Sequence, residues 1–146
     1  MKKWITILAF LITASGVWGH CQVPCGIFND SARLQQINEH ITTIEKAMIQ
    51  IEKIGSKNLN QTTRWITTKE THANDLNTLL HDYFLTQRLK PVSSSASDRE
   101  QSEYYQKLKV IHHMTVATMK SKQSTDLAHT IALKALNKRL HKLFLH

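Results

Sequence analysis

The feature that most constrains the fold is a stripe of apolar residues near the start of the chain. Its members recur every three or four positions and are Leu34, Ile37, Ile41, Ile44, Met48 and Ile51. This spacing places them on one face of an α-helix and is typical of a long amphipathic helix that packs in a bundle. Asp30 or Ser31 can cap the start of this helix, and Gly55 can end it.

A second helix is predicted over about residues 59–88. We expect its inward side chains to be Ile66, Ala73, Leu76, Leu80 and Tyr83. Residues 90–96 contain a proline followed by several serines, which predicts a loop. The pattern therefore breaks between this helix and the next.

Two more helices follow the loop. Ser97 and Glu100 have the spacing of a capping box and open a helix that extends to about Lys120. Its expected inward residues are Tyr105, Leu108, Ile111, Thr115 and Met119. Ser124 or Thr125 can cap the last helix. Its expected inward residues are Ile131, Leu136, Leu140 and Leu143.

Composition supports an all-α fold. The chain has 146 residues but only 4 Gly and 2 Pro, too few for a β-sandwich or barrel that turns about every ten residues. Four helices of comparable length joined by short links predict an up-and-down four-helix bundle over residues 29–146.

Residues 1–19 have the layout of a secretory signal peptide. Lys2 and Lys3 precede an apolar run over residues 4–14, which is shorter than the roughly 20 residues that a transmembrane helix needs. Val17 and Gly19 suit signal peptidase cleavage before His20. We therefore expect export to the periplasm or the extracellular space, without stable membrane association after cleavage. The alternative is an uncleaved membrane anchor.

Cleavage before His20 would create an unusual N-terminus, His-Cys-Gln-Val-Pro-Cys-Gly, with an amine, an imidazole and two thiols close together. The amine of His20, the amide and thiolate of Cys21 and the thiolate of Cys25 offer two nitrogens and two sulfurs. In one plane these donors suit Ni(II) or Cu(II) better than tetrahedral zinc. Two alternatives remain open: Cys21 and Cys25 could form a disulfide in an oxidising compartment, or the motif could arise by chance.

The run His-Cys-x-x-Pro-Cys-Gly at a mature N-terminus resembles the nickel hook of the nickel-containing superoxide dismutases. Residues 64–70 and the triplet 82–84 also resemble the second helix of that family. The resemblance implies an enzyme that converts superoxide into dioxygen and hydrogen peroxide while one nickel per subunit alternates between Ni(II) and Ni(III). It implies that residues 20–28 form the hook, that His20, Cys21 and Cys25 bind the metal, and that subunits assemble as homohexamers.

Several residues depart from the family pattern. Phe28 stands where the family has a Tyr within the hook, whereas Tyr83 matches the family's other Tyr, which gates anion access. Gln35 and Gln36 lie near the place of the acidic residue that orients the axial imidazole. Glu39 lies one turn further along, and His72 takes the approximate place of an Arg that lies behind the metal ligands. These departures leave metal binding expected but affect proton delivery and turnover speed.

Other functions are disfavoured by the sequence. Its 19 basic and 11 acidic side chains give a formal net charge of +8, but Lys and Arg are scattered among carboxylates, so we expect no nucleic acid partner. A positive field instead raises the encounter rate with a small anion such as superoxide. No His-Glu-x-x-His or Glu-x-x-His pattern supports a di-iron site. The alternatives to the dismutase are an exported nickel- or copper-binding module without turnover and a helical bundle with a Cys21–Cys25 disulfide.

Overall fold

A computed structural model describes residues 26–145, which form helices and no strands. The elements are α2 (Asp30–Ile54), the short 3-10 helix η2 (Gly55–Asn58), α3 (Leu59–Thr78), the π-helical segment η3 (Leu79–Arg88), α4 (Asp98–Gln123) and α5 (Ala128–Phe144). Because η3 directly continues α3, the two form one long rod. The predicted all-α fold class is confirmed for this part of the chain.

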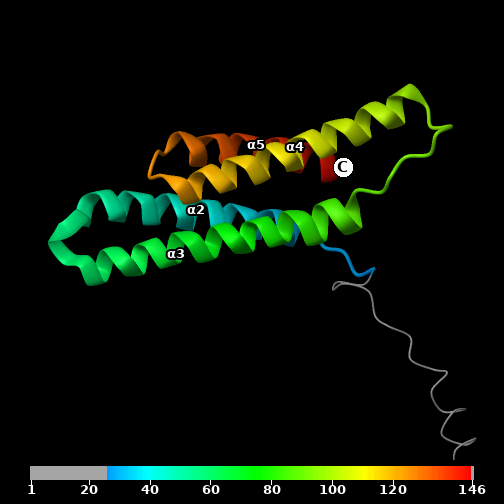
Figure 1. The fold of residues 1–146 in the computed structure, drawn as a ribbon. Helices are drawn as coiled ribbons and strands as arrows, with labels where there is room; N and C mark the ends of the chain where they lie inside the picture. Colours follow the sequence, from blue (N-terminus) through cyan, green and yellow to red (C-terminus); the bar gives the residue numbers. More distant parts are fainter. Residues whose placement is uncertain (1–25, 146) are drawn as a thin grey trace, which may run out of the picture.

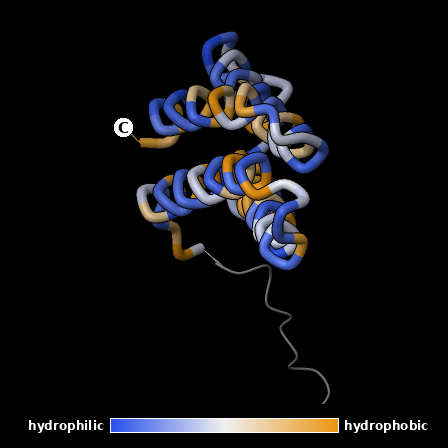
Figure 2. The backbone as a smooth tube through the Cα atoms, turned by 90° about the vertical axis from the view of Figure 1, so that its left-hand side faces the viewer, coloured by the Kyte–Doolittle hydropathy of each residue, from blue (hydrophilic) through white to orange (hydrophobic). Residues whose placement is uncertain are grey.

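The helices form two hairpins (Figure 1). One consists of α2 and α3 with its continuation η3, and the other consists of α4 and α5. A long connection from the end of η3 to the start of α4 joins them, and contacts of α2 with α5 and of α3 with α4 hold them together. In the view of Figure 2 the hairpins form two layers, and every helix carries both hydrophilic and hydrophobic positions. Amphipathic helices bury their apolar faces in this way.

The stripe on α2 is confirmed, but its predicted cap is wrong. Five of the six stripe residues are fully buried, and Ile51 is half-buried. The cap is Asn29, whose side-chain oxygen accepts a hydrogen bond from the Ala32 amide at 3.0 Å. Asp30 is already helical, and its carboxylate binds residues of η3 instead. Gly55 ends α2 as predicted, with a φ of 52° that glycine adopts without strain.

The second predicted helix is confirmed over residues 59–88, although its last ten residues are π-helical, which the sequence did not predict. Ala73, Leu76, Leu80 and Tyr83 are buried as expected. The prediction for Ile66 is wrong, because 43 % of its surface is exposed. Figure 1 shows that the closed end of the α2–α3 hairpin extends beyond the other hairpin, so the start of α3 packs mainly against α2.

The capping box at α4 is confirmed, whereas much of the predicted inward face is wrong. Ile111 is buried and Leu108 and Thr115 are half-buried, but Tyr105 is 60 % exposed and Met119 is 45 % exposed. The buried set is Val110, Ile111, Met114, Ala117, Thr118 and Ser121. Thr118 and Ser121 can be buried because their hydroxyls donate to the carbonyls of Met114 and Ala117 four residues earlier. Tyr105 lies on the first turns of α4, which extend past the end of α5 (Figure 1). The helix ends at Gln123 rather than near Lys120.

The last helix begins later than predicted. Neither Ser124 nor Thr125 caps it; the carboxylate of Asp126 accepts a hydrogen bond from the Ala128 amide at 2.9 Å. The predicted inward face is confirmed in part: Leu140 is buried, and Leu136 and Leu143 are half-buried. The prediction for Ile131 is wrong, because this residue is 62 % exposed. The buried face of α5 is Thr130, Leu133, Asn137, Leu140 and Phe144. Thr130 is accommodated because its hydroxyl donates to the Leu127 carbonyl at 3.0 Å.

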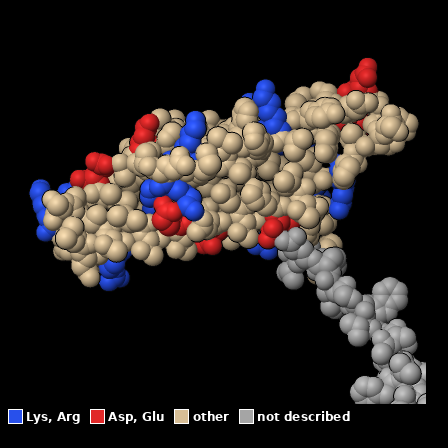
Figure 3. All heavy atoms as spheres, viewed as in Figure 1, with Lys and Arg blue, Asp and Glu red and all other residues tan. Residues whose placement is uncertain are grey.

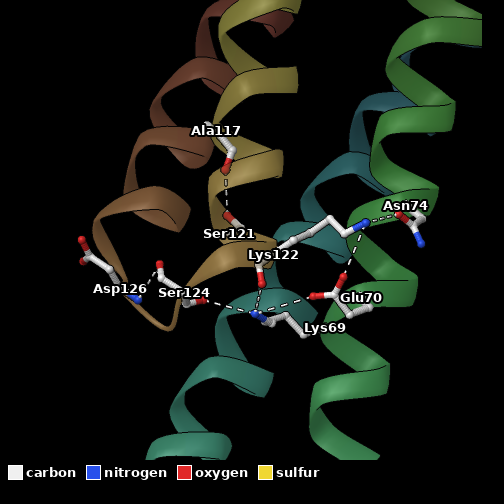
Figure 4. Close-up of polar contacts among 8 residues, drawn as sticks. All are labelled: Lys69, Glu70, Asn74, Ala117, Ser121, Lys122, Ser124 and Asp126. Carbon is white, nitrogen blue, oxygen red and sulfur yellow. Dashed lines mark hydrogen bonds and ion pairs between the residues drawn. The ribbon is translucent and has the colours of Figure 1, made fainter.

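A buried lysine joins the two hairpins (Figure 4). The Nζ of Lys69 on α3 donates to the carbonyl of Lys122 at 2.6 Å and to that of Ser124 at 3.2 Å. These carbonyls lie at the end of α4, where helix geometry leaves such groups unpaired. Glu70 lies 3.7 Å from Lys69 and 3.4 Å from Lys122, and so balances their charge.

We expect Lys69→Met to lower the free energy of unfolding by about 2 kcal/mol, because the carbonyls at the end of α4 lose a charged hydrogen-bond donor while the apolar stem is kept. Urea unfolding followed by circular dichroism measures the change. The exposed Lys57→Met is the matched control and should change stability by less than about 0.5 kcal/mol. Equal stability of the two variants would contradict this role for Lys69.

Candidate functional site

The predicted metal ligands His20, Cys21 and Cys25, like the predicted signal peptide of residues 1–19, lie outside the described residues. The described chain begins at Gly26, one residue after Cys25, with a φ of 75° that favours glycine. Within residues 26–145, no group of three or more His, Cys, Asp or Glu side chains could hold a metal ion. The structure therefore shows how the residues that follow the cysteine motif join the helices.

That junction is held by aromatic packing. The ring of Phe28 meets the ring of Tyr83 edge to face, with 5.8 Å between their centroids. The guanidinium of Arg88 lies 4.9 Å from the centroid of Phe28. Both partners belong to η3, so Phe28 fixes the chain just before α2 against the end of the second helix.

Asp30, at the start of α2, binds both of these η3 residues. Its Oδ1 accepts a hydrogen bond from the Tyr83 hydroxyl at 2.7 Å, and its two oxygens accept from Arg88 in a bidentate ion pair. The Asp30 side chain is only 10 % exposed. Sequence reasoning treated Asp30 as a helix cap and missed this role, because its partners lie 53 and 58 residues further along the chain.

This network sets the protonation of its members. Burial raises the pKa of Asp30, but the hydrogen bonds from Arg88 and Tyr83 outweigh it and bring the pKa below its ordinary value. Burial, together with the hydrogen bond to Asp30, raises the pKa of Tyr83 to about 12. At neutral pH, Tyr83 is therefore a phenol that donates its proton to a carboxylate.

Tyr83 also lines a cavity of about 290 Å³ between α2 and the second helix. The lining residues are Arg33, Gln36, His40, Asp75, Thr78, Leu79, Asp82 and Tyr83. Of the residues singled out from the sequence, Tyr83 and Gln36 share this cavity, whereas Gln35 is exposed and bonds to Glu39. The Arg33 guanidinium lies 5.6 Å from the centroid of the Tyr83 ring.

Sequence reasoning also missed His40. Its Nδ1 lies 3.0 Å from the Nδ1 of His72, so the pair joins α2 to α3 beside the cavity. His72 was noted only for its place in the family pattern. A signal was present, since His40 lies on α2 one position before the apolar stripe residue Ile41, close to the buried face.

The surface carries no large region of one charge on the face seen in Figure 3, where Lys and Arg lie among Asp and Glu. The basic side chains nearest the junction are Arg33, which lines the cavity, and Arg88, whose charge Asp30 partly balances. None of the helices in residues 26–145 is long and apolar enough to span a membrane.

We expect Asp30→Asn to destabilise the protein by about 2 kcal/mol at pH 7, because the amide keeps an acceptor but loses the charge that binds Arg88. The pKa of Asp30 is lower in the folded state, so its contribution is complete above the unfolded-state value of about 4 and is lost as the pH falls through the folded-state value. Urea unfolding at pH 7 and pH 3 should show the difference between variant and parent shrinking in acid.

The control for this variant is Glu103→Gln, which breaks the exposed ion pair with Arg99 and should cost less than about 0.5 kcal/mol. If Asp30→Asn cost no more than this control at pH 7, the network would not stabilise the junction.

Comparison with known families gives one match. The family model described as nickel-containing superoxide dismutase matches residues 15–146, which include the cysteine motif and every described helix. No curated protein and no solved structure matches the chain. The match covers nearly the whole sequence and agrees with the resemblance carried by the N-terminal motif. The chain therefore belongs to the nickel-containing superoxide dismutase family, whose members are oxidoreductases that use nickel to dismutate superoxide.

Proposed function

We propose that signal peptidase removes residues 1–19 and that residues 20–28 then form a nickel hook on an up-and-down four-helix bundle of residues 29–146. His20, Cys21 and Cys25 bind one nickel per subunit. The observation that carries this proposal is the single family match that spans both the cysteine motif and the helices. Support also comes from Phe28, the last residue of this hook, which packs against Tyr83.

The donor set fits nickel. The two cysteines are the only ones in the chain, and a free His20 amine beside the Cys21 amide would complete two nitrogens and two sulfurs. When bound, nickel supplies one-electron redox chemistry between Ni(II) and Ni(III), and the anionic thiolate and amidate donors stabilise the higher state. Both thiols must lose protons to bind, so metal loading weakens as the pH falls.

The described residues control how an anion approaches the end of the bundle where α2 begins and η3 ends. Tyr83 stands between Phe28 and the cavity, and its bond to Asp30 keeps the phenol in place. Arg33 and Arg88 place positive charge on either side of these rings, which favours the approach of superoxide. Phe28 supplies aromatic packing there but no hydroxyl.

The active protein is an exported homohexamer in this proposal. The signal peptide layout supports export to the periplasm or the extracellular space. Large apolar side chains remain exposed on the single chain, and an assembly can cover them. They include Ile27, Leu59, Tyr105 and Ile131, each at least 60 % exposed.

We expect Cys21→Ser and Cys25→Ser each to abolish nickel binding in the chain that begins at His20, because a serine hydroxyl does not replace a thiolate donor at neutral pH. Metal analysis of the purified protein measures this directly. The matched control is the same chain with one extra Gly before His20, which keeps both thiols but displaces the amine. Superoxide decay after pulse radiolysis should be fast only with the free His20 amine.

Each other outcome has a distinct meaning. Nickel bound at full stoichiometry by either serine variant would contradict the hook. Nickel without turnover in the chain that starts at His20 would identify a binding module that does not catalyse. A parent chain that binds no nickel and has no free thiols would identify a bundle with a Cys21–Cys25 disulfide.

Tyr83→Phe should leave nickel content unchanged, because Tyr83 is not a proposed ligand. It should lower the rate of superoxide decay by about a hundredfold, because without the hydrogen bond to Asp30 the ring no longer keeps its place beside the cavity. Azide affinity, read from the spectrum of the nickel protein, should change as well. The exposed Tyr105→Phe is the control and should match the parent. A Tyr83→Phe variant without nickel would show that this residue supports the metal site itself.

A further inference from the structure

His40 and His72 form a contact that the dismutase mechanism above does not use. His40 on α2 is only 8 % exposed, whereas His72 on α3 is half-buried. Their rings lie 5.2 Å apart between centroids, and the two Nδ1 atoms are 3.0 Å apart. When both rings are neutral, one Nδ1 carries a proton and donates a hydrogen bond to the other Nδ1. A single proton therefore lies between the Nδ1 of the half-buried His72 and the Nδ1 of the buried His40.

The second nitrogen of His40 has no partner. Its Nε2 is buried and makes no hydrogen bond, while the His40 side chain lines the cavity that also contains Tyr83 and Gln36. An unpaired buried ring nitrogen is unfavourable, so a turn of the ring that lets Nε2 bond to water in the cavity would stabilise it. The cavity of about 290 Å³ has room for several waters, since each occupies about 30 Å³ in the liquid.

The charges around the pair keep His40 neutral. Burial and the neighbouring His72 lower the pKa of His40, and Asp75 on α3 and Glu39 on α2 only partly oppose them. Arg33, Asp82 and Tyr83 also line the cavity and face the same space. A neutral imidazole can donate or accept at Nε2, which is the property that proton transfer needs.

We propose that His72 and His40 conduct protons from solvent to the cavity beside Tyr83, where they serve the reduction of superoxide to hydrogen peroxide. This inference rests on the proposed function, because it assumes that turnover occurs at this end of the helices. Reduction of one superoxide consumes one electron, which the nickel cycle supplies, and two protons. His40 and His72 are positioning residues here, since they act through water in the cavity.

The transfer balances one proton taken up against one released. A proton from solvent binds the Nε2 of His72, and the proton on the Nδ1 of His72 moves to the Nδ1 of His40 across the 3.0 Å contact. After the transfer the Nδ1 of His40 is the donor and the Nδ1 of His72 is the acceptor. The contact between the rings then opens, and the His40 ring turns its buried Nε2 toward the cavity that the side chain lines. His40 releases the Nε2 proton to a water there, and that water protonates the peroxide. The original tautomers return while the contact is open and each ring exchanges protons with water.

The first test uses the metal-free protein, so it does not depend on catalysis. Nitrogen-15 NMR of labelled histidines should show one proton shared between the Nδ1 atoms of His40 and His72, and a His40 ring that stays neutral below the usual pH range of histidine titration. His72→Gln should remove the shared proton signal. Two independent ring signals without a shared proton in the parent would overturn the proposal.

The second test follows superoxide decay by the nickel-loaded protein between pH 7 and pH 9. His72→Ala and His72→Gln should keep the nickel content and the nickel spectrum of the parent, yet lose about a hundredfold in rate at high pH, the lower range for general acid catalysis. Free imidazole should restore the rate of His72→Ala. The control is His81→Ala, an exposed histidine that bonds to Thr115 outside the cavity and should match the parent.

The outcomes separate this inference from the proposed function. A parent that binds nickel but does not consume superoxide would defeat the proposed function, and the relay with it. An active parent whose His72 variants keep the same pH profile, or whose His72→Ala rate does not respond to imidazole, would overturn the relay alone. Circular dichroism of each variant shows that it is folded before its rate is compared.

Discussion

The arrangement of the functional end depends on the carboxylate of Asp30. It is the first residue of α2, and it ties that helix to Tyr83 and Arg88 on η3. Arg88 in turn lies over Phe28, the last aromatic residue before the helix and three positions after Cys25. One buried charge therefore fixes both Tyr83 and, through Arg88, the chain just before α2. The hydrogen bonds from these two residues lower the pKa of Asp30 despite its burial.

How far the sequence predicts this fold depends on what each helix buries. The α2 stripe is correct because Leu, Ile and Met fill most of the inward positions, although the pattern does not find the buried His40 and Ala47. On α4 and α5 the buried face includes Thr118, Ser121 and Thr130, whose hydroxyls bond to their own helix and so cost little to bury. An apolar pattern cannot find such positions, and it assigned Tyr105 and Ile131 to the core instead.

The candidate site likewise contains a part that the sequence predicts and a part that it does not. The sequence suffices to propose His20, Cys21 and Cys25 as ligands, because such a chelate is local, within six consecutive residues. The contact of His40 with His72 and that of Asp30 with Arg88 join residues 32 and 58 positions apart. They depend on how α2 and the second helix align across Gly55, and on the π-helical turn of η3, which no local pattern in this sequence specifies.

The phenylalanine at position 28 limits which side chains near Tyr83 can donate protons. The resemblance placed a tyrosine at this position, and the structure shows that phenylalanine keeps the ring packing against Tyr83 and Arg88 without the hydroxyl. The hydroxyl of Tyr83 remains, but it donates to Asp30, and a pKa of about 12 keeps its proton bound at neutral pH. His40 differs from both, because its side chain lines the same cavity and its buried Nε2 makes no hydrogen bond to another protein group. Since dismutation consumes protons, a chain that lacks one hydroxyl and engages the other needs a different donor, and the histidine pair has the position and the chemistry for that role.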